Sequence, residues 1–246
     1  MARMPRKTSK TGYYHIMMRG NNKEFIFEKD IDKRYFLKLL KTVVEEGLIS
    51  VAAWCIMDNH VHLIIKSEPK ELAKSLASIN TKFAMKYNNK NERIGHVFQE
   101  RFKSQVIEDE KYLLKAIRYV HQNPVSADIV SNISEYKWSS YNLYLFKTWS
   151  ENMSFVMKLF DNNIESFIKF HRKHDNQKHL EVKEDLINID IKKVNRLIEY
   201  HSSNGKENLS EEKLIKDILN NTELTNRNIA GILKVSYSKV QRISKK

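Results

Sequence analysis

The 246-residue chain has few of the residues that cross-link a fold or interrupt its helices and strands. It contains one cysteine, three prolines and six glycines, and 41% of it is hydrophobic. A single cysteine, Cys55, excludes an intrachain disulfide, so a reducing cytoplasm is the simplest location to expect. The scarcity of glycine and proline, together with the hydrophobic content, excludes a disordered chain and favours a folded, helix-rich protein.

Long apolar segments are also missing. The longest uninterrupted apolar run covers only residues 51–57, whereas a membrane-spanning helix needs roughly 20 apolar residues. The basic N-terminus has no apolar core of the kind found in signal peptides. We therefore expect no membrane span.

Acidic residues are absent from both ends of the chain. Residues 1–23 and residues 224–246 each carry six basic side chains and no acid, which leaves 31 bases against 30 acids between them. The net charge of +13 is thus concentrated at the termini. A polyanionic partner such as DNA would explain this placement, and a basic tail that only aids solubility is the alternative.

The spacing of apolar residues predicts an α+β fold. Strands are expected at residues 13–18, 49–57 and 60–66 and in an extended stretch at 97–106, and helices at residues 30–46, 69–87 and 109–122. Gly47 is expected to cap the first helix, Asp58-Asn59 to join two strands into a hairpin, and Pro124 to end the third helix. This order is typical of a ferredoxin-like antiparallel sheet with helices on one face. A helical region at 147–246, with helices near 155–168, 186–200 and 210–219, is expected to follow a first domain at 1–146.

Two histidines stand two positions apart at the start of an expected strand. His60 and His62 therefore point to the same face. Their imidazoles can share a divalent cation and leave open positions for phosphate oxygens, although a purely structural pair is the commoner meaning of such a motif. His15 and His96 could approach this site. Three other histidines lie in a polar, basic stretch and are expected to be solvated: His171, His174 and His179.

Tyr119 and Asn123 are spaced to share one face of the third helix. The Asn123 side-chain oxygen could be a third metal ligand, which would hold the Tyr119 phenol over a bound phosphate. A free phenol has a pKa near 10, and a nearby cation would make its phenolate a better nucleophile. A tyrosine packed in the core is the alternative, and the chain has eleven tyrosines.

Five short segments occur in a characteristic order within residues 12–146. They are Tyr14-His15 with Arg19-Gly20-Asn21-Asn22, Met57-Asp58-Asn59-His60-Val61-His62-Leu63-Ile64, Gly95-His96-Val97-Phe98-Gln99-Glu100-Arg101-Phe102-Lys103-Ser104, Tyr119-Val120-His121-Gln122-Asn123-Pro124-Val125 and Trp138-Ser139-Ser140-Tyr141. Together they resemble the REP-associated tyrosine transposases, a group within the single-tyrosine HUH transposases.

The resemblance implies a ferredoxin-like HUH nuclease domain that uses Mg²⁺ or Mn²⁺ and acts on single-stranded DNA with nearby hairpins. It implies that His60 and His62 are metal ligands, that Asn123 takes the place of the polar third ligand, and that Tyr119 is the nucleophile. Three basic residues become candidates for DNA contacts: Arg19, Arg101 and Lys103. Relatives act as monomers or as homodimers that exchange tyrosines, and the sequence leaves that choice open.

The C-terminal residues 225–245 have the pattern of a helix-turn-helix. Thr225 and Ser236 are suitable N-caps, and Lys234 occupies the turn, where a left-handed backbone would cost about 1 kcal/mol. The second helix would present four side chains to the major groove of duplex DNA: Tyr237, Lys239, Gln241 and Arg242. A helical pair that binds another protein is the alternative.

Three functions follow from these features. The first is a metal-dependent transposase that cuts and rejoins single-stranded DNA through a 5′-phosphotyrosine on Tyr119. The second is a sequence-specific DNA-binding protein, a repressor or repeat binder derived from a transposase. The third is a metal phosphodiesterase that uses water, which would tolerate the loss of Tyr119.

Overall fold

The computed structural model describes residues 7–148, 150–173, 194, 197–198, 211–222 and 224–244. These residues fall into two compact units that divide between Leu180 and Glu181. The first unit continues past residue 146, where the sequence suggested a boundary, because buried residues of two later helices, such as Met153 and Phe167, join its hydrophobic core. Each unit is described by itself below.

The first unit is built on a four-stranded antiparallel sheet. Its strands are β1 (Tyr13–Arg19), β2 (Ser50–Ile56), β3 (His60–Lys66) and β4 (Lys103–Ile107), in the spatial order β2-β3-β1-β4. Every neighbouring pair is antiparallel. The predicted mixture of an antiparallel sheet with helices is therefore confirmed, although the last strand is shorter than expected. Before β4, Phe98 forms an isolated bridge with Gly20, the residue that follows β1, and the N–H of Gln99 bonds to the carbonyl of Arg19.

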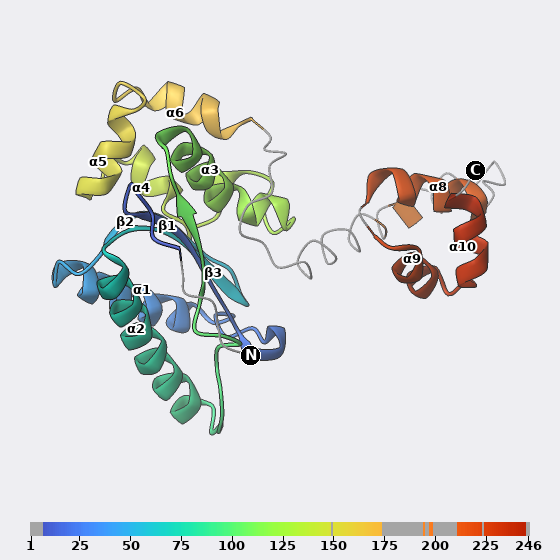
Figure 1. Cartoon of the computed structure of the whole chain (residues 1–246), viewed down its shortest axis with the longest axis horizontal. Helices are drawn as coiled ribbons and strands as arrows, with labels where there is room; N and C mark the ends of the chain where they lie inside the picture. The colour runs from blue at the N-terminus through green and yellow to red at the C-terminus, as the bar shows by residue number, and fades with distance from the viewer. Residues whose placement is uncertain are drawn as a thin grey trace. The chain divides into compact units, whose positions relative to one another are not determined.

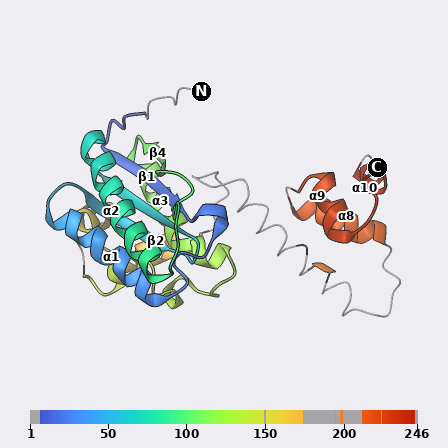
Figure 2. The same cartoon turned by 90° about the horizontal axis from the view of Figure 1, so that it is seen from below.

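Helices cover both faces of this sheet, so the expectation of helices on one face is wrong. Figures 1 and 2 show α1 (Asp30–Glu45) and α2 (Pro69–Lys90) on one face. On the other face lie α3 (Glu110–Ser126), α4 (Tyr141–Leu145), α5 (Glu151–Lys158) and α6 (Ile164–His171) (Figure 1). The burial of the central strands gives the physical reason: all seven residues of β1 are buried, whereas a strand with one solvated face would alternate.

The ends of two helices test specific sequence predictions. Gly47 follows α1 with φ +71°, and the next N–H, of Leu48, bonds to the carbonyl of Val43, which confirms the predicted glycine cap. Pro124, by contrast, lies inside α3, so its predicted role as the end of that helix is wrong. Proline has no backbone N–H, so it removes one helical hydrogen bond, and it does so only in the last turns of α3. The helix ends two residues later, at Ser126. Beyond this end, Asp128 adopts φ +56° and the N–H of Ile129 donates to the Pro124 carbonyl.

Two short 3-10 helices complete the first unit, at Asn21–Lys23 and Ile133–Glu135. In the first of them, Asn22 has a left-handed backbone with φ +49°. Among the described residues, no helix combines the length and the apolar character that crossing a membrane requires.

The second unit is helical in the part that the structure describes. It contains α8 (Glu211–Asn221), α9 (Asn226–Leu233) and α10 (Tyr237–Ser244), which bury a small apolar core that includes Ile215, Ile229 and Val240. Thr225 caps α9 by accepting a hydrogen bond from the Asn228 N–H, as predicted. Most of the helix expected at 186–200 lies outside the described residues.

Candidate functional site

The two histidines of the H-x-H motif lie on the sheet face that α3 covers. His60 and His62 are 7% and 2% exposed, and their ring centroids are 4.9 Å apart. In the register of the sheet, His60 lies opposite Arg19 and His62 lies opposite Met17, both on β1. The prediction that both rings share one face is confirmed by the contact between them.

Both imidazoles are oriented by a hydrogen bond at Nδ1. His60 Nδ1 lies 2.6 Å from Asn59 Oδ1, and His62 Nδ1 lies 3.0 Å from Nε2 of His15. Because an amide oxygen only accepts, the Nδ1–H of His60 is the donor in the first bond. A histidine that binds a metal is typically held in this way, by a hydrogen bond at the ring nitrogen that does not bind the metal. His15, which the sequence suggested as a neighbour of the site, is fully buried beside it.

Tyr119 reaches the histidines from α3. Its ring centroid lies 5.6 Å from that of His62 and 5.7 Å from that of His15, with edge-to-face geometry in both pairs. Asn123 lies one turn further along α3 and is 9% exposed. The sequence places Tyr119 and Asn123 on one helix face, and the fold brings that face against β1 and β3.

The predicted basic residues do not all lie at this site. Arg19 and Lys103 share the face of the histidines, because Arg19 pairs with His60 and Lys103 pairs with Met17, which also pairs with His62. Arg19 is almost fully buried and Lys103 is partly exposed. Gln105, which the sequence did not single out, lies opposite His15 on the same face. Within the part of the chain that the structure describes, its buried amide oxygen has no hydrogen-bond partner.

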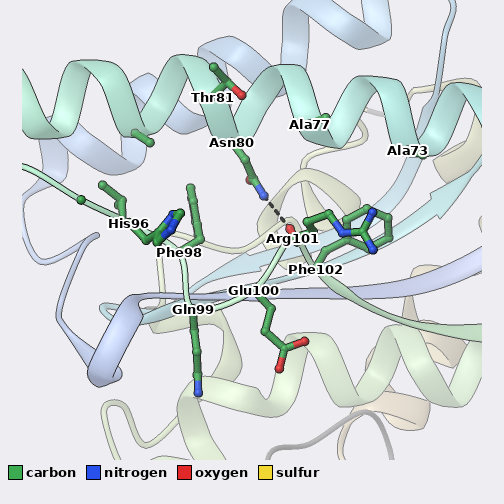
Figure 3. A pocket seen from close by; sticks show the side chains of 13 residues that line it. Ala73, Ala77, Asn80, Thr81, His96, Phe98, Gln99, Glu100, Arg101 and Phe102 are labelled. Carbon is green, nitrogen blue, oxygen red and sulfur yellow. Dashed lines mark hydrogen bonds between the residues drawn. The ribbon is translucent and has the colours of Figure 1, made fainter. Parts of the chain in front are cut away.

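Arg101 lies elsewhere, along a cavity of about 540 Å³ between α2 and residues 95–102. Figure 3 shows this cavity, with Asn80 of α2 donating a 2.6 Å hydrogen bond to the carbonyl oxygen of Arg101. His96 is exposed and lines the same cavity. The suggestion that His96 could approach the histidine pair is therefore not supported by the position it takes beside α2.

A second histidine pair lies on the opposite side of α3. His121 and His171 are both buried, with Nδ1 of His121 3.0 Å from Nε2 of His171. The expectation that His171 is solvated is wrong, because α6 packs it against α3; His174 and His179 lie outside the described residues. Burial lowers the pKa of His121 well below its ordinary value, and it lowers the pKa of His171 to about 3. Both rings are consequently neutral near pH 7.

The candidate DNA contacts of the second unit lie on α10. Tyr237 and Arg242 are exposed, whereas Lys239 and Gln241 are partly buried. Lys239 forms an ion pair with Glu211 of α8. The connection between α9 and α10 contains Lys234 with φ +55° and ψ +38°, so the left-handed turn considered from the sequence is present.

Comparisons with known proteins find similarity to transposases. Residues 8–123 match the family described as "Transposase IS200 like". A protein of Haemophilus influenzae named "Putative REP-associated tyrosine transposase" is 23% identical over 155 residues, which cover 58% of this chain and 86% of the relative. A solved structure of a REP-associated tyrosine transposase bound to a REP hairpin gives a TM-score of 0.49 at 16% identity, and covers 62% of this chain and 93% of that one.

Residues 8–123 are thus similar to the transposases of this family. Within that class, the resemblance to the REP-associated tyrosine transposases that the ordered motifs indicated is confirmed.

Proposed function

We propose that this protein cuts and rejoins single-stranded DNA beside hairpins, with Tyr119 as the nucleophile. The contact of the Tyr119 ring with His62 and His15 is the observation that carries the proposal. It brings the phenol of Tyr119 against a pair of oriented imidazoles. The sheet order β2-β3-β1-β4 is also the order of a ferredoxin-like HUH nuclease domain, which supports the assignment.

The residues at the site fit a divalent metal. His60 and His62 engage the protein through Nδ1, so Nε2 is the nitrogen that each would offer to a metal ion. Within the described ranges, no group of three or more His, Cys, Asp and Glu side chains could hold a metal. A third ligand would therefore be of another residue type. The proposed ligand set is the imidazoles of His60 and His62 and the amide oxygen of Asn123. Bound Mg²⁺ or Mn²⁺ would polarise the scissile phosphate.

In the proposed reaction, the phenol oxygen of Tyr119 attacks the phosphorus as the phenol loses its proton. The bond from phosphorus to the 3′-oxygen breaks, which leaves a 5′-phosphotyrosine and a free 3′-hydroxyl. In the reverse step, a 3′-hydroxyl attacks the phosphotyrosine and restores the phosphodiester. Arg19 and Lys103 share the sheet face of the histidines and are the candidates for holding DNA phosphates there. One chain supplies every proposed group, so a monomer suffices for the chemistry.

The test uses hairpin oligonucleotides drawn from the DNA that flanks the coding region, with Mg²⁺ or Mn²⁺ and denaturing gels. The wild-type protein is expected to form a covalent protein–DNA band that Tyr119→Phe abolishes. Tyr112→Phe is the matched control, because Tyr112 lies two turns earlier on α3. Attachment that survives in the Tyr119→Phe protein would refute the assignment. Cleavage without attachment in that variant would point to water as the nucleophile.

We also propose that α9 and α10 act as a helix-turn-helix that anchors the enzyme on duplex DNA. The left-handed turn at Lys234 and the exposure of Tyr237 and Arg242 on α10 support this role. The second candidate function, a repressor or repeat binder, rests on the same helices. Tight duplex binding with no cleavage in manganese would favour it over the enzyme.

A further inference from the structure

Arg118 and Gln122, which lie close to Tyr119 in the sequence, contact α6 and the residues directly after it. The guanidinium carbon of Arg118 lies 4.6 Å from the centre of the Phe170 ring. The side-chain amide of Gln122 donates to the carbonyls of His171 and Lys173, at 2.6 and 2.9 Å. Since α6 (Ile164–His171) lies beyond residues 8–123, the family match says nothing about it.

The central link between α3 and α6 is a chain of hydrogen bonds whose directions can be assigned. His171 Nδ1 must donate to the carbonyl of Phe167, at 2.9 Å, because a carbonyl only accepts. The neutral His171 ring therefore accepts at Nε2 from Nδ1–H of His121, at 3.0 Å. The same reasoning makes His121 Nε2 the acceptor of the Ser140 hydroxyl, at 2.8 Å.

The chain ends on the central sheet. The Ser140 oxygen accepts a 2.9 Å hydrogen bond from the backbone N–H of Trp54, which belongs to β2. A continuous path of buried polar groups thus runs from the last turns of α6, through α3, to β2. Every group along this path has a partner, and a fully satisfied buried network fixes one arrangement of the elements it joins.

The orientation of α3 matters because a small rotation of the helix displaces the end of the Tyr119 side chain by a distance that affects the reaction. Side-chain ends lie roughly 5–6 Å from a helix axis, so a rotation of about 10° moves them by about 1 Å. A displacement of about 1 Å between reacting groups can reduce a rate about 100-fold. The rings of Tyr119 and His62 meet edge to face, so a rotation of α3 directly changes how the two side chains lie relative to each other.

We propose that α6 is a positioning element for the nucleophile and that His121 and His171 are positioning residues: they hold α3 at the rotation that aims Tyr119 at the histidine pair. The proposal rests on the proposed role of Tyr119. It assigns a function to a helix that follows the matched family region and to two histidines that take no part in the proposed metal site (Figure 1).

The test compares DNA attachment by the full-length wild-type, His121→Phe and Tyr144→Phe proteins. Phenylalanine keeps a flat aromatic ring at this position but makes neither hydrogen bond. Tyr144→Phe is the matched control, because the Tyr144 ring packs 5.7 Å from His121 and its hydroxyl donates a buried 2.6 Å hydrogen bond to the Ala52 carbonyl of β2. The control thus removes a buried hydrogen bond to the same sheet without touching the chain through His121.

Two quantities are measured with the flanking-DNA hairpins. The first is the dissociation constant in EDTA, and the second is the first-order rate of covalent attachment at saturating DNA in Mn²⁺. We expect His121→Phe to lower the rate by about 10- to 100-fold with little change in the dissociation constant. Tyr144→Phe is expected to leave both quantities near the wild-type values. A purely structural role for His121 would lower thermal stability alike in both variants without this selective loss of rate.

Gln122→Met provides a second variant that disturbs only the edge of the contact with α6. It removes the two hydrogen bonds to the carbonyls of His171 and Lys173, and it is expected to lower the attachment rate in the same sense as His121→Phe. Wild-type attachment rates in both His121→Phe and Gln122→Met would overturn the positioning role and leave the role of Tyr119 intact. Attachment that persists in Tyr119→Phe would overturn both proposals.

Discussion

The turn that precedes His60 and His62 is anchored by a partly buried ion pair, and this pair allows a quantitative prediction. Lys33 of α1 places Nζ 2.6 Å from Asp58 Oδ1, and the two side chains are 5% and 45% exposed. The same ammonium lies 5.9 and 5.8 Å from the ring centres of Tyr136 and Trp138. Asp58 immediately precedes Asn59 and His60, so this ion pair holds the start of β3 against α1.

Removing one partner of the pair should cost more than removing the other. Asp58→Ala leaves a buried ammonium without its carboxylate. Loss of one partner from a fully buried pair costs about 3–5 kcal/mol, and the partial exposure of Asp58 reduces this to about 2 kcal/mol. For a unit of this size that is a fall in melting temperature of about 4–8 °C. Lys33→Met removes the charge that needs a partner and keeps the apolar stem, so it should cost less than about 1 kcal/mol.

Urea denaturation of the two single variants and the double variant would measure this asymmetry. The double variant should be about as stable as Lys33→Met alone, which gives a coupling of about 2 kcal/mol. Any cost that Asp58→Ala imposes on the turn itself appears in both the single and the double variant, so it cancels in the coupling. Additive losses, or a Lys33→Met variant as unstable as Asp58→Ala, would refute the reasoning.

Three further predictions concern other parts of the chain. Gly20→Ala should destabilise the first unit by at least about 1 kcal/mol in thermal denaturation, because its new Cβ would stand 2.4 Å from the Glu24 carbonyl oxygen. Burial depresses the pKa of His171 from 6.5 to about 3, so the stability it contributes is complete above pH 6.5 and is lost as the pH falls toward 3; unfolding scans across this range should show a smaller loss of stability for His171→Phe than for the wild type. Arg242→Ala should weaken duplex binding and reduce the salt dependence by about one phosphate contact in filter-binding titrations, and an unchanged slope would remove Arg242 from the interface.

Much of the secondary structure could be predicted because its signals are local. The β3 strand was predicted with its observed bounds, since the alternation begins directly after the Asp58-Asn59 turn. The glycine cap of α1 and the Thr225 cap of α9 follow from conformations that only a few residue types favour. The prediction that α3 ends at Pro124 is wrong, because the rule that proline disfavours helix at the preceding residue describes an average preference. Packing of the buried Asn123 and Pro124 overrides that preference here.

Residue spacing is enough to predict which side chains can act together on one element: His60 with His62 on a strand, and Tyr119 with Asn123 on a helix. These pairs follow from the periods of two and 3.6 residues. Which of these pairs meet, and what surrounds them, depends on the packing of the whole unit. In the folded chain, His15 lies beside His62, Arg101 lies at a cavity beside α2, and His171 is buried against His121. Such contacts join residues as much as 50 positions apart, and they depend on strand order and on which sheet face each helix covers, neither of which a local pattern encodes.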